Sequence, residues 1–320
     1  MSYAQARACW HASNPPRHYL SVTDLTRQSA ETVLTLAHAM KRATRGGQEL
    51  FRFERPIAVA LIFEKPSLRT RATLEAGLYQ MGAHGVYLTQ SDIQMGTREA
   101  VMDIARNLGR WVQGVIARVF LHTALEELAR FSDVPVVNAL SDCEHPCQAL
   151  ADLMTIQERF GTAPCTLAWV GDGNNVCHSF TLLAAMLGHT IRIATPEGYT
   201  PRPEILQQAQ AFAAESGGAV IVMDDPREAV ADADVVYTDV WVSMGFETER
   251  EARMRKFLPY QVNESLLALA KPDAIVLHCL PARRGEEITD AVLDGAQSAV
   301  WDQAENRLHT QKALLALMLG

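Results

Sequence analysis

Four polar side chains within five residues could bind a phosphate group. They belong to the stretch SLRTR and are Ser67, Arg69, Thr70 and Arg71. Arginine guanidinium groups bind phosphate oxygens through pairs of parallel hydrogen bonds, and hydroxyl groups supply further donors. This spacing therefore indicates an anion-binding site, provided that the local fold points these side chains the same way.

The flanking sequence predicts that SLRTR lies where a buried strand passes into a helix. Residues 57–63 form a short run of mostly branched apolar residues, which is typical of a buried strand. Pro66 and Ser67 are favoured at helix starts, and apolar residues recur at helical spacing from 73 to 81. A helix N-terminus favours an anion through its N–H groups and its dipole. The alternative is an ordinary capped helix with solvated arginines.

Three more polar side chains could contact a ligand. Arg118 is embedded in the apolar stretch GVIARVF, and a charge at the end of a buried strand commonly points to the sheet edge where ligands bind. A structural ion pair is the alternative for this arginine. His145 and Gln148 are three residues apart at a predicted helix start, so both could donate hydrogen bonds to one oxygen. His145 could instead be a helix cap or a core histidine.

The stretch GDGNN begins a second set of strands and helices. A glycine turn after a strand is also how dinucleotide-binding domains start, but only Gly171 and Gly173 fit that pattern. The next predicted strand, TIRIATPEG, has no acidic residue before Thr195, so an NAD site is disfavoured. The amides of Asn174 and Asn175 are better suited to the carboxylate of an amino acid.

Two later segments place polar groups at the ends of predicted strands. Asp239, Ser243 and Met244 lie in DVWVSMG, where a buried carboxylate would hold an ammonium group; a helix cap is the alternative. Cys279 ends the strand AIVLHCL, and a cysteine in that place is more often inert than reactive. Arg307 is predicted near the start of an apolar C-terminal helix, unless it is only a solvated residue.

Alternating strands and helices predict an α/β protein with two doubly wound domains. Both sheets are expected to be mainly parallel, with a cleft between the domains. The first domain is predicted at residues 1–142 and the second at 143–304, and a C-terminal helix at 305–320 should pack back onto the first domain. A short strand is also predicted at 298–302.

Composition excludes several classes of protein. The chain has 320 residues, 48% of them hydrophobic, and a net charge of -8, which argues against a nucleic-acid surface. No membrane-spanning run or secretory signal is recognisable, so a cytoplasmic protein is expected. Six scattered cysteines indicate no disulfide framework, and the spacing of Cys143, His145 and Cys147 does not fit a structural zinc site. No metal or cofactor is expected.

Five stretches in order carry a resemblance to a known family. SLRTR, HPCQ, GDGNN, DVWVSMG and HCLPARRGEE together resemble the aspartate/ornithine carbamoyltransferase family, and its ornithine branch in particular, from about Tyr19 to the C-terminus. The resemblance implies that the side-chain amine of L-ornithine attacks carbamoyl phosphate, giving L-citrulline and phosphate. It also implies a homotrimer, or a multiple of one, in which Gln94 reaches the site of a neighbouring subunit.

The same resemblance implies roles for individual residues of this chain. The residues expected to bind carbamoyl phosphate are Ser67, Leu68, Arg69, Thr70, Gln94, Arg118, His145, Gln148, Leu280 and Arg307. The residues expected to bind ornithine are Asn175, Asp239, Ser243, Met244 and Cys279. Four of these are expected to be catalytic, namely Arg118, His145, Asp239 and Cys279.

Two positions depart from the family pattern. Leu68 stands where many relatives have threonine, and leucine is also found there in relatives that use modified ornithines; Arg283 replaces a common histidine or tyrosine. An acceptor such as N-acetylornithine, N-succinylornithine or putrescine is therefore the alternative, although DVWVSMG favours ornithine. An NAD-dependent dehydrogenase and a non-catalytic binding subunit are the other hypotheses, and the full set of expected polar residues argues against the latter.

Overall fold

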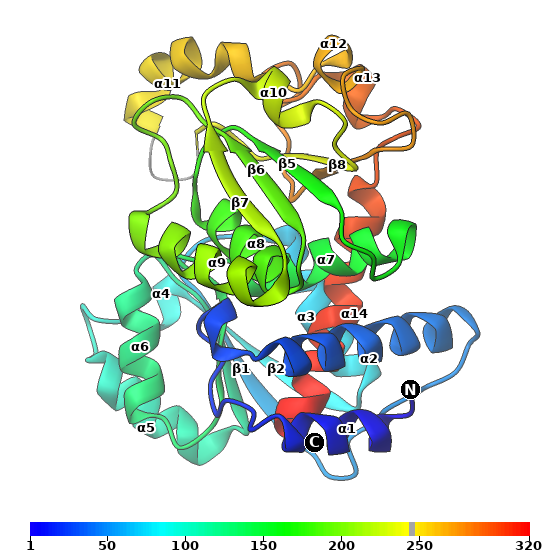
Figure 1. Ribbon diagram of the computed structural model, residues 1–320. Coiled ribbons are helices and arrows are strands. Elements are labelled where there is room, and N and C mark those ends of the chain that lie inside the picture. The colour runs from blue at the N-terminus through cyan, green and yellow to red at the C-terminus, as the bar shows by residue number, and fades with distance from the viewer. Residues whose placement is uncertain (243–246) are drawn as a thin grey trace. The chain divides into compact units, whose positions relative to one another are not determined.

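The computed structural model describes every residue except 243–246 and divides into two compact units (Figure 1). Unit 1 comprises residues 1–154 and 305–320, and unit 2 comprises residues 155–304. The chain crosses from one unit to the other twice, within helix α7 (Pro146–Phe160) and within helix α14 (Val300–Leu319).

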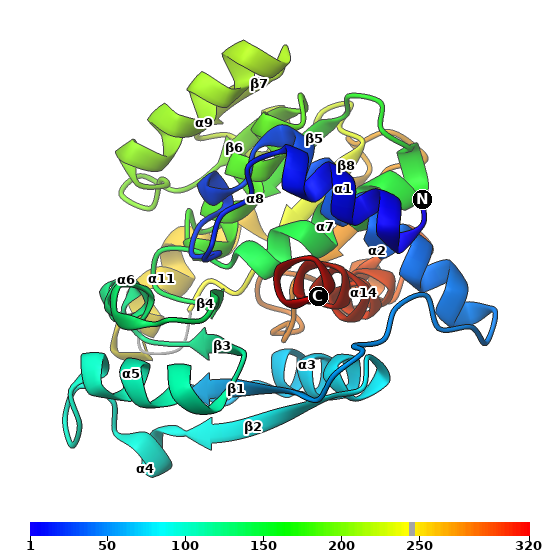
Figure 2. The ribbon, with the colours of Figure 1, turned by 90° about the horizontal axis from the view of Figure 1, so that it is seen from below.

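Unit 1 is built on a parallel sheet of four strands. Their order is β2 (Ala83–Thr89), β1 (Ile57–Phe63), β3 (Gly114–Arg118) and β4 (Val136–Leu140), which Figure 2 shows side by side. Phe63 pairs with Arg118, and Arg118 pairs with Leu140, so three strands finish level with one another. The loops that follow them therefore share one edge of the sheet.

Helices cover both faces of this sheet. The helices of unit 1 before α7 are α1 (Tyr3–Ala12), α2 (Arg27–Arg45), α3 (Leu68–Gln80), α4 (Gln90–Ile93), α5 (Val101–Trp111) and α6 (His122–Phe131). On one face, α5 and α6 bury Ile104 and Leu125 against Ala117. On the other, Leu74 of α3 and Leu315 of α14 lie beside Ile116. Successive residues of β3 thus face opposite helical layers, as a strand requires.

Unit 2 repeats this plan with five parallel strands. Their order is β7 (Ala219–Met223), β6 (Thr190–Ala194), β5 (Thr166–Val170), β8 (Val235–Thr238) and β9 (Ile275–His278). Its helices are α8 (Asn175–Met186), α9 (Pro203–Ser216), α10 (Pro226–Val230), α11 (Arg250–Phe257), α12 (Glu264–Leu267) and α13 (Asp290–Leu293). Trp169 of β5 packs on Phe180 of α8, whereas its neighbour Ala168 belongs to the cluster formed with α10 and α12.

The predicted fold class is confirmed, since both sheets are parallel and doubly wound. The predicted strand at 298–302 is wrong. Ser298 makes only an isolated bridge with Val276, and Val300 then begins α14. A short apolar run cannot distinguish a strand from a buried helix start by periodicity, and Val300 is buried among the side chains of unit 2. The sequence pattern also missed α1 and α6.

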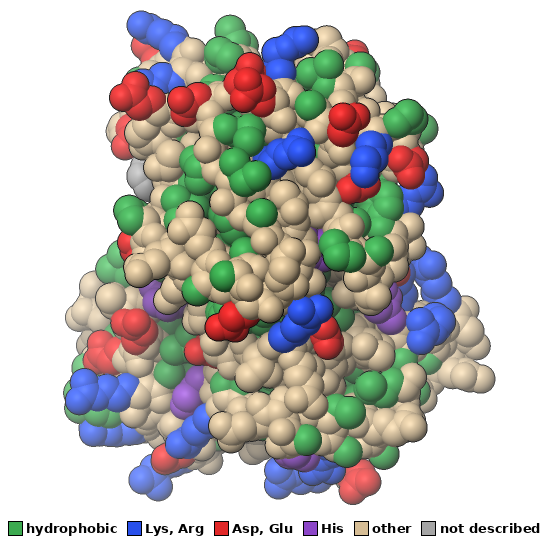
Figure 3. Space-filling view, viewed as in Figure 1, with side chains coloured by type: hydrophobic (Ala, Val, Ile, Leu, Met, Phe, Trp, Pro, Cys, Tyr) green, Lys and Arg blue, Asp and Glu red, His purple; other side chains and the backbone are tan. Residues whose placement is uncertain are grey.

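Surface charge, helix character and the cysteines can be compared with the composition. On the face shown in Figure 3, acidic and basic side chains are interspersed rather than gathered by sign. Within the described part of the chain, the structure contains no helix with the length and apolar character needed to cross a membrane. No disulfide joins the six cysteines, all of which are described.

The turn after β5 generates a prediction about stability. The N–H of Gly173 donates to the carbonyl of Tyr199 at 2.8 Å, and a Cβ added to Gly173 would lie 2.3 Å from the backbone nitrogen of Pro201. Gly173→Ala should lower the free energy of unfolding by roughly 1–3 kcal/mol, because backbone and ring atoms must move. Urea unfolding would measure this change.

Gly46→Ala is the matched control. The nearest atom to a Cβ at Gly46 is 3.4 Å away, and its φ is -85°, which alanine adopts easily. This variant should stay within about 0.5 kcal/mol of the unsubstituted protein. Equal stability of both variants would show that the turn does not need a glycine.

Candidate active site

In unit 1 the predicted residues gather where the strand order reverses. The chain passes from β1 outward to β2 and then returns to β3 on the other side of β1. Ligands of open α/β sheets bind at the carboxyl ends of the strands at such a switch point. Ser67 follows β1, Arg118 ends β3, and His145 follows β4, so all three lie at this edge.

The start of α3 has the geometry of an anion site. Ser67 is the N-cap, and its Oγ accepts a hydrogen bond from the N–H of Thr70 at 3.4 Å. Arg69 is half-buried in the first turn, whereas Leu68 is 78% exposed, so Leu68 can contribute its backbone N–H but no polar side chain. The first N–H groups of a helix have no acceptor within that helix. Pro66 lies just before the cap rather than inside the helix.

Arg307 fixes the orientation of two neighbouring polar groups. It is buried in α14 and donates to Gln148 Oε1 at 2.6 Å and to Thr70 Oγ1 at 3.1 Å. Gln148 in turn donates to Asp152 Oδ1 at 2.8 Å. Because the Thr70 oxygen accepts from a guanidinium, its own O–H can point to another acceptor such as a ligand. Arg307 lies in the middle of α14, not near its start as predicted, and it is not a solvated residue.

His145 stays uncharged in this environment. Burial lowers its pKa well below the ordinary value, and the charges of Arg307, Arg118 and Arg69 lower it further. A neutral imidazole can donate one hydrogen bond to a carbonyl oxygen without adding charge to the site. The same three arginines make this edge of the sheet strongly attractive to an anion.

Gln94 has a different location from the other expected carbamoyl phosphate ligands. It is exposed at the end of α4, with a φ of 47°, and its carbonyl accepts hydrogen bonds from the N–H groups of Thr97 and Arg98. The local chain thus holds its backbone in a left-handed turn that presents the side chain to solvent. Leu280, another of the expected carbamoyl phosphate ligands, is a residue of unit 2 and not of unit 1.

In unit 2 the predicted residues also lie at a switch point, here between β5 and β8. Asp239 follows β8 and is 5% exposed, and its Oδ2 accepts from Asn174 Nδ2 at 2.7 Å. Its Oδ1 accepts from the Cys279 thiol at 3.0 Å and from the N–H of Val240 at 2.8 Å. Loops after three different strands therefore converge on one buried carboxylate.

Of the two asparagines named from the sequence, Asn174 is the one that contacts Asp239. Its Oδ1 caps α8 by accepting from the N–H groups of Val176 and Cys177, and its amide nitrogen donates to Asp239. Asn175 is the first residue of α8 and is half-buried. Asparagine is strongly preferred at an N-cap, which explains the local role of Asn174. Ser243 and Met244 lie outside the described residues.

Asp239, His278 and Cys279 do not form a ready metal centre. One ligand atom each from Asp239, His278 and Cys279 lies within 4.8 Å of the others. However, His278 Nδ1 accepts from the N–H of Leu280 at 2.8 Å, and Nε2 lies 3.0 Å from Glu287 Oε1. Both ring nitrogens already have partners, so a metal would have to displace one of them.

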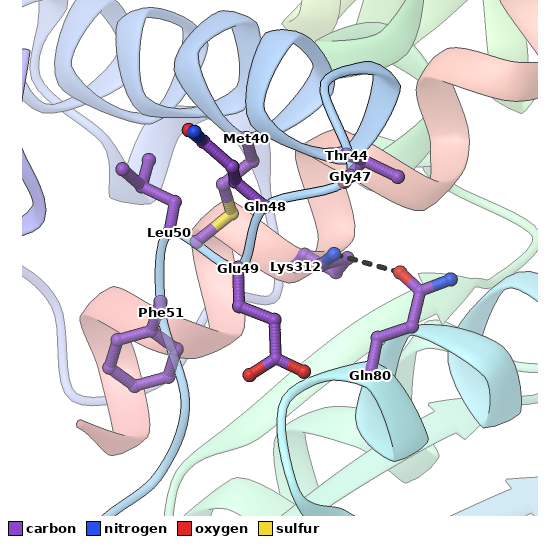
Figure 4. Close-up of a pocket in the computed structure, with 9 residues that line it drawn as sticks. All are labelled: Met40, Thr44, Gly47, Gln48, Glu49, Leu50, Phe51, Gln80 and Lys312. Atoms are coloured by element: carbon purple, nitrogen blue, oxygen red, sulfur yellow. Dashed lines mark hydrogen bonds between the residues drawn. The ribbon is translucent and has the colours of Figure 1, made fainter.

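A cavity of about 220 Å³ lies elsewhere in unit 1, as Figure 4 shows. It is lined by residues that precede β1, by the last residue of α3, Gln80, and by Lys312 of α14. Lys312 donates to Gln80 Oε1 at 2.8 Å. None of the predicted site residues lines this cavity, which therefore belongs to a different part of the unit.

Family models match both halves of the chain. The model described as the carbamoyl-P binding domain of aspartate/ornithine carbamoyltransferase matches residues 17–158. The model described as the Asp/Orn binding domain of the same family matches residues 163–318. The chain belongs to the aspartate/ornithine carbamoyltransferase family.

Individual members of this carbamoyltransferase family are similar over nearly the whole chain. The ornithine carbamoyltransferase of Thermococcus kodakarensis is 50% identical over 305 residues, which cover 95% of this chain and 96% of that protein. That of Methanopyrus kandleri is 50% identical over 303 residues, covering 95% and 97%. The solved structure of the Pyrococcus furiosus ornithine carbamoyltransferase superposes with a TM-score of 0.93 at 48% identity, covering 96% and 98%.

The lowered pKa of His145 generates a prediction about pH. The unfolded chain binds a proton at this side chain near pH 6.5, whereas the folded chain does not, so the free energy of unfolding falls as pH drops below that value. The loss amounts to at most about 1.4 kcal/mol per pH unit. In His145→Gln this contribution should disappear, which urea unfolding between pH 5 and pH 8 would measure.

The exposed residue His84 provides the control. His84→Gln should leave the pH dependence of unfolding as it is in the unsubstituted protein. The assignment of a neutral, buried His145 fails if both variants show the same pH dependence.

Proposed function

We propose that this chain transfers the carbamoyl group of carbamoyl phosphate to the side-chain amine of L-ornithine, giving L-citrulline and phosphate. The observation that carries the proposal is the opposite charge of the two sheet edges. Arg69, Arg118 and Arg307 surround a neutral histidine in unit 1, and the buried carboxylate of Asp239 lies at the equivalent edge of unit 2. One substrate is an anion and the other carries an ammonium group. Membership of the family and its ornithine carbamoyltransferase relatives support the same reaction.

Carbamoyl phosphate is assigned to unit 1. Its phosphate would accept from the first N–H groups of α3 and from Ser67, Arg69 and Thr70, where the helix dipole favours negative charge. Its carbonyl oxygen would accept from Arg118, His145 and Arg307. Gln148, held by Arg307 and Asp152, has a second amide hydrogen for the carbamoyl group.

Ornithine is assigned to unit 2. Asp239 would hold an ammonium group, while Asn174 and Cys279 keep the carboxylate in place from two sides. By family resemblance, Asn175, Ser243 and Met244 would bind the amino-acid end and Leu280 would contact the carbamoyl group. These binding roles remain proposals, and the domain boundary at residue 142 stays a prediction.

The chemistry depends on charge that develops during the attack. A nitrogen–carbon bond forms, negative charge collects on the former carbonyl oxygen, and the carbon–oxygen bond to phosphate then breaks. Donors from Arg118 and His145 to this oxygen, with Arg69 close by on the phosphate, would favour this tetrahedral state over the flat substrate. The attacking amine must first lose a proton, since a free side-chain ammonium has a pKa of about 10.4. Removal of water would lower that pKa, whereas Asp239 alone would raise it.

We also infer a homotrimer, or a multiple of one. The exposed side chain of Gln94, on a turn with a fixed backbone, suits the role in a neighbouring subunit's site that the family resemblance implies. A mixture of a Gln94→Ala chain and a chain inactive at Arg69 would regain activity only if subunits share sites.

Product analysis with a panel of amines tests the proposed reaction. The purified protein with carbamoyl phosphate and L-ornithine should form citrulline, and N-acetylornithine, N-succinylornithine and putrescine should react far more slowly. The exposed Leu68 makes the modified ornithines the alternative acceptors to compare. Turnover of one of these amines but not of ornithine would contradict ornithine as the acceptor. It would still support carbamoyl transfer as the reaction.

Two substitutions should separate the two binding roles. Arg69→Ala should weaken the binding of carbamoyl phosphate, and Asp239→Ala should weaken the binding of ornithine. Each effect should be roughly 10- to 100-fold, because each substitution removes a charge-assisted hydrogen bond. Steady-state kinetics with each substrate varied in turn would measure both effects. Equal losses for both substrates in both variants would show that the assignment of one substrate to each unit is wrong.

A further inference from the structure

We propose that Arg253 of α11 is a positioning residue for the amino-acid substrate, because its guanidinium contacts three loops at the carboxyl edge of the second sheet. The proposal rests on the assignment of ornithine to unit 2. It concerns a residue that neither its sequence context nor the family resemblance singles out.

The contacts of Arg253 reach a different loop in each direction. Nη1 donates to Asp172 Oδ2 at 2.8 Å in the loop after β5, and to the carbonyl of Trp241 at 3.1 Å in the loop after β8. The guanidinium lies 4.8 Å from the ring centre of Tyr199, in the loop after β6. Nε donates to Glu249 Oε2 at 3.0 Å, which ties Arg253 to the chain just before α11.

The pair of Arg253 with Asp172 is not a surface ion pair. Arg253 is 7% exposed, and Asp172 is also largely withdrawn from solvent. The ring of Trp241 is stacked on Phe257 of α11 at 5.9 Å, and Tyr199 packs edge-on against the same phenylalanine at 4.8 Å. Truncating a buried charge of this kind leaves its partner buried and uncompensated, which is costly.

Two of the loops that Arg253 contacts carry Asn174 and Asp239, the carboxylate proposed to bind the substrate. Asp172 is two residues before Asn174, and Trp241 is two residues after Asp239. Asn174 and Asp239 are joined by the 2.7 Å hydrogen bond described above. Arg253 therefore connects the two backbone segments on either side of that bond.

Arg253 also offsets negative charge around Asp172. The pKa of Asp172 is raised to about 6, mainly by burial; Arg253 lowers it, whereas the nearby charges of Asp239 and Glu249 raise it. The Cys177 thiol of α8 also faces this pair of carboxylates, and burial raises its own pKa. Without Arg253, the carboxylate of Asp172 would repel that of Asp239 or would take up a proton, and either change would disturb the ammonium site.

Protonation of Asp172 gives the proposal a pH signature. Above pH 6 the carboxylate is charged and binds Arg253 through a charge-assisted hydrogen bond, and as pH falls through about 6 that bond weakens. The KM for ornithine should therefore rise at low pH in a step that depends on Asp172. Asp172→Asn keeps the shape and an acceptor oxygen but carries no charge, so this step should be absent in that variant.

Steady-state kinetics of Arg253→Met, with each substrate varied, is the main test. The KM for ornithine should rise by roughly 10- to 100-fold, and the KM for carbamoyl phosphate should stay within about twofold. Arg253→Lys keeps the charge but loses the planar fork, so its effect should be intermediate. Arg255→Met is the control, since Arg255 lies on the same helix, is 83% exposed and pairs only at 3.8 Å with Glu251.

The outcomes separate this inference from the proposed function. Unchanged kinetics of Arg253→Met beside a wild type that makes citrulline would overturn the positioning role and leave the function intact. The positioning role also fails if both KM values rise together, or if Arg255→Met has an equal effect. A wild type without ornithine turnover would overturn the function, and this inference with it. If Arg253→Met does not fold, Arg253→Lys and the pH profile of Asp172→Asn decide.

Discussion

Parallel pairing of strands is the constraint on which both sites depend. In a parallel sheet every carboxyl end lies at the same edge, so residues that follow different strands meet although the sequence separates them. The register of unit 1, in which Phe63, Arg118 and Leu140 are level, places the start of α3 beside the start of α7. In unit 2 the same constraint places Asn174 and Cys279 within hydrogen-bonding distance of Asp239.

Charge then distinguishes the two edges. Burying an arginine is costly unless its donors find acceptors, and two of the donors of Arg307 bind Gln148 and Thr70. Both of these acceptors are neutral, so the two hydrogen bonds orient the guanidinium without an opposite charge. Asp239 likewise accepts from an amide, a thiol and a backbone N–H, all of them neutral. At each edge these hydrogen bonds thus orient an ionisable side chain through neutral partners.

Local signals in the sequence were sufficient for most of the fold. The apolar run at β1 and the serine before α3 predicted the strand and the helix start, because each depends on a few adjacent residues. The anion site predicted there stays a prediction. The strand predicted at 298–302 is wrong, because Val300, the one buried residue of that stretch, belongs to helix α14. The partners of Arg307 lie 159 and 237 residues away, and no spacing rule connects such positions without the fold.

The position of Arg253 shows why composition alone hides a residue of this kind. Helix α11 reads REARMRKF, with an arginine or lysine at four of eight positions, which predicts an exposed, solvated helix. Only one of these arginines, Arg253, is buried, because only its position on the helix faces the loops after β5 and β8. Arg255, two residues further along the same helix, is exposed. Burial converts an ordinary charge into one that must be matched by Asp172, and this match joins the segments that carry Asn174 and Asp239.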